Sequence, residues 1–156
     1  MDVKYINPFV LATKTVFKTM LNLEVTMDKP RLKTDKTTSG DVTGVMGLVG
    51  DKKGTVCISF QRKGALFAYK TLMGDDRSDM DPEVVDAIGE LTNIISGQAR
   101  KELESSGVNL KASIPTVVVG LAVALHFMSS APIISLPFQF PTNNGNEALY
   151  VDFSFE

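Results

Sequence analysis

The feature of this sequence that most restricts its fold is a long amphipathic helix, predicted over residues 81–104. The helix begins at Asp81-Pro82-Glu83, because Asp is a good N-terminal cap and Pro suits the first helical position. The apolar side chains that follow recur at three- and four-residue spacing, which places them on one face. They are Val84, Val85, Ile88, Leu91, Ile95 and Ala99. A helix of this length has to bury that face against a second layer.

The segments around this helix predict that the second layer is a β-sheet. Before it we expect a helix opening at Asn7-Pro8, a polar loop over 29–40, a β-hairpin over 41–60 and a short helix over 63–73. After it come the strand-like residues 112–128, 132–140 and 148–156. This order is typical of an α+β fold with long helices packed on a mostly antiparallel sheet.

The two halves of the chain predict one domain made of two similar units. Pro8 and Pro82 each open a helix, and strands follow each helix, so the halves look like duplicated α-β-β units. A length of 156 residues suits a single domain with a sizeable core. We therefore treat residues 1–156 as one domain.

Composition excludes several kinds of site. The net charge is −2 and no run of Lys and Arg is present, which argues against a nucleic-acid surface. Cys57 is the single cysteine and His126 the single histidine, so neither an internal disulfide nor a His/Cys zinc cluster can form. We expect a buried thiol, a core histidine and a reducing, cytoplasmic compartment. The apolar run 116–128 falls short of the ~20 residues that span a bilayer, which favours buried strands over a membrane segment.

The polar face of the predicted helix has an unusual composition. At about 100° per residue, five residues fall in one arc opposite the apolar face: Asp86, Glu90, Asn93, Gly97 and Arg100. Asn has a low helix propensity, and each interior Gly, such as Gly89 and Gly97, costs about 1 kcal/mol relative to Ala. A solvated face without a role is the simpler interpretation and stays open. The costly residues favour a functional face, in which Gly97 leaves room for a partner's backbone.

The residue types on this face restrict its chemistry. The Asn93 amide donates and accepts hydrogen bonds but is neither a proton-transfer group nor a nucleophile, which suits it to hold a water molecule in line with an electrophile. Glu90 could bind a cation on a partner. Such a pair catalyses a reaction only when the substrate brings a metal ion and a labile bond. An acyl phosphate in a protein that binds Mg²⁺ meets this condition.

The run DAIGELTNIISGQARKEL resembles the signature helix of the CheC/CheX/FliY phosphatases of bacterial chemotaxis. The family pattern places Asp or Ser, then Glu, then Asn on the helix and a proline further along the chain. In this sequence these positions are Asp86, Glu90, Asn93 and Pro115. The segments INPFVLATKTVFKTML, GVMGLVGDKKGTVCISF and SIPTVVVG also resemble CheX proteins, so the resemblance covers nearly the whole chain.

The resemblance implies that the chain removes the phosphoryl group from the aspartate of a CheY-type response regulator. Asn93 would orient the attacking water and Glu90 would form a salt bridge with a regulator lysine. The regulator would supply Mg²⁺, so the chain needs no cofactor or metal of its own. Further contacts with the partner would come from Asp86, Gly97 and Arg100, whereas Pro115 would shape the entry to a strand.

The resemblance also implies a homodimer with one site per chain. Relatives of the CheC type carry a second E-x-x-N motif on their first helix, but residues 6–23 contain none. An alternative is a non-catalytic module that binds a response regulator or a motor-switch protein through the same helix. A small-molecule domain built on the apolar strands is a third interpretation, although no convergent polar set supports it.

Overall fold

The computed structural model describes residues 3–156, in which a first set of helices and four strands is followed by a second set of helices and four strands. The helices are α1 (Val3–Val16), its π-helical continuation η1 (Phe17–Leu21), α2 (Arg62–Met73) and α3 (Pro82–Ser105). The strands are β1 (Thr26–Met27), β2 (Arg31–Lys33), β3 (Val42–Gly50), β4 (Lys53–Phe60), β5 (Leu110–Ala112), β6 (Thr116–Val119), β7 (Ile133–Thr142) and β8 (Gly145–Phe155).

The described strands form one antiparallel sheet of eight strands in the order β1-β7-β8-β4-β3-β5, with β2 also beside β7 and β6 beside β3. Two long hairpins, β3–β4 and β7–β8, make its centre and meet along β4 and β8. One hairpin follows α1 and the other follows α3, and the two helices pack against each other. The predicted α+β fold with duplicated α-β-β halves is thus confirmed.

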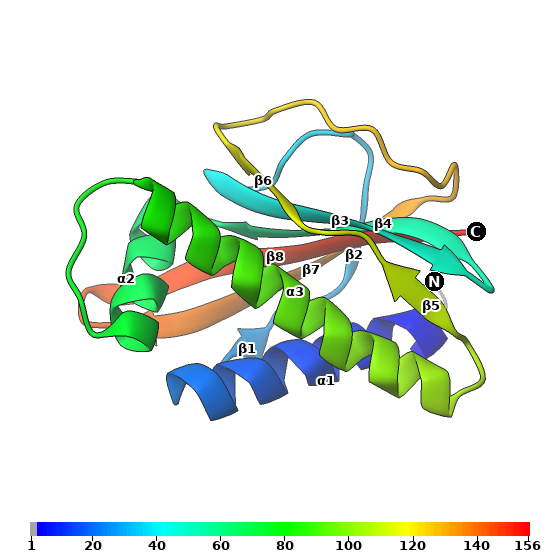
Figure 1. Cartoon of the computed structure of the whole chain (residues 1–156), viewed down its shortest axis with the longest axis horizontal. Coiled ribbons are helices and arrows are strands. Elements are labelled where there is room, and N and C mark those ends of the chain that lie inside the picture. The colour runs from blue at the N-terminus through cyan, green and yellow to red at the C-terminus, as the bar shows by residue number, and fades with distance from the viewer. Residues whose placement is uncertain (1–2) are drawn as a thin grey trace.

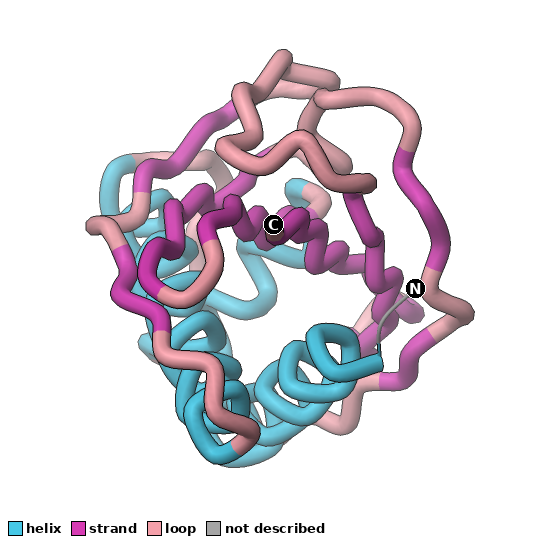
Figure 2. The backbone as a smooth tube through the Cα atoms, turned by 90° about the vertical axis from the view of Figure 1, so that its right-hand side faces the viewer, coloured by secondary structure: helices cyan, strands magenta, loops and turns pink. Residues whose placement is uncertain are grey.

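All the helices lie on one face of the sheet, and loops cover the other face (Figures 1 and 2). The main core fills the space between helices and sheet. Its largest fully buried side chains include Phe9, Phe17, Phe60, Phe138, Phe140 and Phe153. The rings of Phe9 on α1 and Phe153 on β8 stack with their centroids 4.6 Å apart. Aromatic side chains of this size supply much of the apolar area that a domain buries.

The close approach of α3 to the sheet depends on Gly44 in β3. A Cβ atom at this position would lie 1.9 Å from Oγ1 of Thr92, which donates a hydrogen bond to the Ile88 carbonyl 2.8 Å away. Because Gly44 leaves this space empty, the helix rests directly on the strand. The predicted apolar face is buried accordingly, with Val85 at its edge partly exposed.

The start of α3 is also as predicted. The Asp81 side chain accepts hydrogen bonds from the backbone N–H groups of Glu83 and Val84, both at 3.1 Å, and Pro82 follows it in the first turn. The bond from the Val84 N–H is the main reason that the pKa of Asp81 lies below its ordinary value. The cap satisfies backbone donors that have no partner within the helix.

Two expectations about the N-terminal half were wrong. Helix α1 already includes Val3, so Pro8 lies inside it rather than at its start. Pro8 is buried with Ile6 and Phe9, and this packing offsets the one backbone hydrogen bond that a proline removes. The supposed loop over 29–40 contains the short strand β2, which pairs with β7.

The expectation that residues 116–128 form buried strands was also wrong. Only Thr116–Val119 is a strand, at the margin of the sheet, and the chain then crosses the loop-covered face. The loop is held there by bonds such as that from the Met128 N–H to Thr55 Oγ1, at 2.9 Å. His126 is exposed, not a core residue, because the loop sends only part of its side chains inward.

The loop-covered face has its own small core, which contains Cys57, Phe127 and Ile133. As predicted, Cys57 is buried, and burial raises the pKa of its thiol far above the usual range. The neighbouring Asp152 is also buried; Ser39 donates a hydrogen bond to its Oδ2 at 2.6 Å, and Ser135 donates one to its Oδ1. Burial raises the pKa of Asp152 above its ordinary value, since a carboxylate loses its hydration there.

Candidate functional site

The predicted polar face of α3 does point away from the sheet. Asp86, Glu90 and Asn93 are exposed, while Gly97 and Arg100 further along are half-buried. With a rise of about 1.5 Å per residue, Glu90 and Asn93 stand about one turn apart on the same side. The apolar face beneath them is buried against β3, so the packing of the helix determines the direction in which the two side chains point.

A cleft of about 620 Å³ borders this face. The helix contributes Asp86, Gly89, Glu90 and Asn93, and the segment between β5 and β6 forms the opposite wall with Ile114 and Pro115. Pro115 comes near the helix because β6 pairs with β3, which α3 also contacts. Pro115, just before β6, therefore lines the same cleft as the Glu90–Asn93 pair.

Gly89 allows the helix to lie close to this wall. A Cβ atom there would meet the side chain of Val117 on β6 at 3.2 Å, which is tighter than an ordinary contact. In the sequence, Gly89 is recognisable only as a residue that weakens the helix. The neighbour that accounts for it lies 28 residues later in the chain, so the local pattern carried no sign of it.

Three polar side chains of this face have no partner in the described part of the chain. Among residues 3–156, no hydrogen bond or ion pair engages the side chains of Asp86, Glu90 or Asn93. A carboxylate and a carboxamide in this state are hydrated and free to exchange water for a ligand. Because the pair is exposed, a partner would have to cover it before water could be excluded from a reaction.

The first turn of α3 is held by Arg77, which no sequence motif singles out. Arg77 forms ion pairs with Asp81 at 3.0 Å, Glu83 at 2.7 Å and Asp75 at 2.8 Å. Its guanidinium also lies 5.5 Å from the centre of the Tyr69 ring. The sequence signal for this network is the position of Arg77 in an acidic loop, with carboxylates on both sides of it. The network ties α2, the loop and α3 together, so the site is carried on a well-anchored helix.

The described part of the chain offers no metal centre of its own. Within residues 3–156, no group of three or more His, Cys, Asp or Glu side chains is placed to hold a metal ion. The same residues include no helix that is long and apolar enough to cross a membrane.

Fold and site together define a class of protein. The exposed Glu90–Asn93 pair, on an anchored helix beside an open cleft, is accessible to another macromolecule. Residues 42–139 match the family model described as "Chemotaxis phosphatase CheX". This chain belongs to the CheX family.

Relatives with known names or structures agree with this assignment. The chain is 28% identical over 138 residues to the CheY-P phosphatase CheX of Thermotoga maritima, with 88% of each chain covered. The crystal structure of the chemotaxis protein CheX from Vibrio vulnificus is similar with a TM-score of 0.85 and 33% identity, over 97% of this chain and 99% of that one. A structure of the CheX–CheY–BeF₃–Mg²⁺ complex from Borrelia burgdorferi matches with a TM-score of 0.78 and 26% identity, over 97% of both chains.

Proposed function

We propose that this protein is a phosphatase that hydrolyses the phospho-aspartate of a CheY-type response regulator. The observation that carries the proposal is the unpartnered Glu90–Asn93 pair, exposed on one face of α3 beside the cleft that Pro115 lines. Membership of the CheX family supports it, as do a relative named CheY-P phosphatase and a relative crystallised with CheY, BeF₃ and Mg²⁺.

In the proposed reaction Asn93 holds the water that attacks phosphorus. Its carbonyl oxygen accepts a hydrogen bond from the water and its amide N–H₂ donates to an acceptor nearby. The bond between phosphorus and the carboxylate oxygen breaks, and the products are inorganic phosphate and a free aspartate of the regulator. The proton of the attacking water ends on the phosphate or in solvent. Asn93 contributes by orientation, because an amide does not take the proton.

Glu90 places the regulator. One turn before Asn93, its carboxylate would pair with a regulator lysine, and a charge-assisted bond of this kind fixes orientation as well as distance. The Mg²⁺ that neutralises the phosphoryl oxygens would come with the regulator. Asp86, Gly97 and Arg100, on the same face, would make further contacts with the partner.

The proposal includes a cytoplasmic homodimer. The side of the sheet formed by β5 and β6 is open to a second chain, and apolar side chains stand exposed beside it, with Val119 54% and Leu121 75% exposed. Pairing along this side would bury them. Sedimentation or light scattering of the wild type and of Leu121→Asp measures the oligomeric state directly.

The test of the phosphatase is release of phosphate from an Mg²⁺-bound, phosphorylated CheY-type regulator. Wild type is expected to accelerate release. Asn93→Ala should lose most of the acceleration, on the order of 100-fold or more, because the water is no longer oriented. Asn143→Ala, the same change in the exposed β7–β8 turn, is the matched control and should behave as wild type.

The same assay separates the proposal from its alternative. A wild-type protein that binds the regulator but leaves the rate of phosphate release unchanged would be a non-catalytic binding module. Equal rates for wild type and a folded Asn93→Ala would show that another group carries the reaction.

A further inference from the structure

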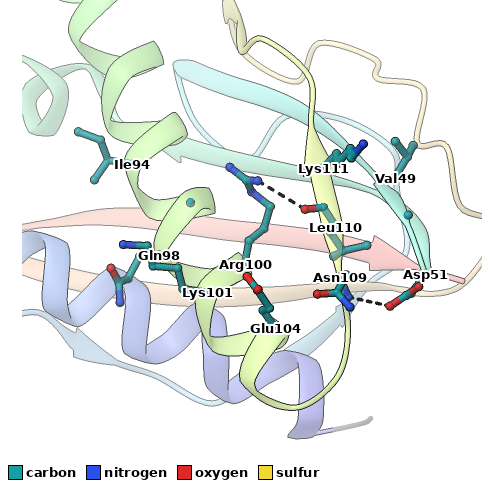
Figure 3. A pocket seen from close by; sticks show the side chains of 12 residues that line it. Val49, Asp51, Ile94, Gln98, Arg100, Lys101, Glu104, Asn109, Leu110 and Lys111 are labelled. Atoms are coloured by element: carbon teal, nitrogen blue, oxygen red, sulfur yellow. Dashed lines mark hydrogen bonds between the residues drawn. The ribbon is translucent and has the colours of Figure 1, made fainter.

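A second cleft, of about 790 Å³, continues along α3 beyond the Glu90–Asn93 pair (Figure 3). It lies between the second half of the helix, β5 and the turn that joins β3 to β4. Gly97 and Lys101 of the helix and Lys111 of β5 are among the residues that line it. Arg100 lines both clefts, so the second continues directly from the first.

Arg100 uses little of its hydrogen-bonding capacity. Its guanidinium reaches between α3 and β5, where one N–H group donates to the Leu110 carbonyl at the long distance of 3.5 Å. Its Nε is buried and has no partner. A guanidinium carries five N–H donors, and a buried donor without an acceptor costs free energy. The Arg100 guanidinium therefore has N–H donors that are available to a hydrogen-bond acceptor of another molecule.

The charges around this cleft are also incompletely paired. Within the described chain no ion pair engages Arg100, Lys101 or Lys111. The carboxylates beside them are Asp51, which accepts a hydrogen bond from the Asn109 N–H at 2.8 Å, and Glu104. Three cations thus face two anions, one of which is already engaged. At the other end of α3, by contrast, Arg77 is surrounded by carboxylates.

We propose that the second cleft is a docking subsite for an acidic segment of the same response regulator, with Arg100 pairing with a carboxylate of that segment. The inference rests on the proposed function, because Glu90 and Asn93 are what bring the regulator to this face. Arg100 lies seven residues beyond Asn93, a rise of about 10 Å along the helix. A phosphoryl group held at Asn93 does not extend so far, so the acceptor is a separate group of the regulator.

The geometry of the subsite suits such a segment. An added Cβ at Gly97 would have only an Arg100 nitrogen near it, 3.8 Å away, so the helix surface is open to a partner's backbone there. The planar fork of an arginine binds a carboxylate through two parallel hydrogen bonds. Since this contact is distant from the reacting atoms, it contributes to affinity and to the choice of regulator and leaves the chemical step unchanged.

The experiment measures the affinity for a regulator activated with beryllofluoride and Mg²⁺, which requires no turnover. Arg100→Gln is expected to raise Kd about tenfold, which corresponds to about 1.4 kcal/mol, and to weaken the dependence of Kd on salt. Its kcat for phosphate release should remain that of wild type, while KM rises. Arg100→Lys should recover only part of the loss, because an ammonium lacks the fork.

Controls separate docking from folding and from net charge. Gln at position 100 keeps a polar side chain while removing the charge, and an unchanged melting temperature checks the fold. Lys36→Gln removes one positive charge from an exposed position in the loops over the opposite face of the sheet, and it should bind as wild type. Among Asp→Lys and Glu→Lys variants of the regulator, one should restore binding of Arg100→Glu and weaken that of wild type.

The outcomes separate this inference from the proposed function. If Arg100→Gln binds the regulator with a Kd within twofold of that of wild type, the docking subsite is refuted and the proposed phosphatase is not. The same holds if its kcat falls while its Kd is unchanged. A wild type that binds through Arg100 without hydrolysis refutes the phosphatase and leaves the subsite standing. A wild type that neither binds nor hydrolyses any regulator of its organism overturns both.

Discussion

Replacing Gly44 by Ala should destabilise the protein by forcing α3 away from β3. The new Cβ would lie 1.9 Å from Thr92 Oγ1 and 2.7 Å from Thr92 Cβ, whereas carbon atoms in favourable contact are about 3.5–4.0 Å apart. Rotation of Thr92 removes the first clash but not the second, because Cβ is attached to the helix backbone. Overpacking typically costs 1–3 kcal/mol, and we expect the upper end, about 3 kcal/mol, since neither backbone can yield independently.

Chemical denaturation followed by circular dichroism measures this loss, and thermal melting should show a decrease of about 6–12 °C for a domain of this size. Gly97→Ala is the control, because it is the same substitution on α3 at a position where the new Cβ would clash with nothing. There the gain in helix propensity should stabilise the free protein by about 0.5–1 kcal/mol. The same change should weaken regulator binding if a partner approaches closely at Gly97.

A compensating change tests the cause of the effect. In a Gly44→Ala background, Thr92→Gly removes all three clashing atoms, so the double variant should be more stable than Gly44→Ala alone despite the poor helix propensity of glycine. A melting temperature of Gly44→Ala within about 1 °C of wild type would refute the packing argument. Strictly additive losses in the double variant would refute it as well, because residues in contact should couple.

The buried groups on the loop-covered face give two further predictions. Burial raises the pKa of Asp152 in the folded protein. The contribution of this side chain to the free energy of unfolding is therefore complete below its pKa in the unfolded chain, about 3.9. It is lost as the pH rises through the folded-state pKa. Stability measured from pH 3 to 7 should therefore fall relative to Asp152→Asn as the pH rises; a difference that does not change with pH would contradict this. Cys57 should react with a thiol reagent at least about 100-fold more slowly in the native protein than in urea, since the thiolate is the reactive form; equal rates would show that the thiol is accessible.

Local sequence was sufficient to predict those features that depend on residues within a single helix or hairpin. The cap at Asp81, the buried apolar face of α3 and the exposure of Glu90 and Asn93 all follow from neighbours within a few turns, and the structure has them as predicted. The hairpin β3–β4 could also be predicted, because a short turn joins its two strands.

Sequence-based prediction was wrong where distant segments compete for one layer. Residues 116–128 are apolar enough for a central strand, yet the positions beside β4 are occupied by β3 and β8. The segment is left as a short marginal strand and a loop, and His126 is exposed as a result. Hydrophobicity indicates that a segment tends to be buried, but it does not indicate which segments pair with the central strands of the sheet.

The sequence by itself determined that α3 presents an acid and an amide on a common face, since helical periodicity is a local property. The tertiary structure alone decided what surrounds that face: Pro115 opposite the pair, Arg77 at the helix start, and the two clefts that meet at Arg100. These neighbours depend on strand pairing and on contacts between elements far apart in the chain, which no local pattern encodes.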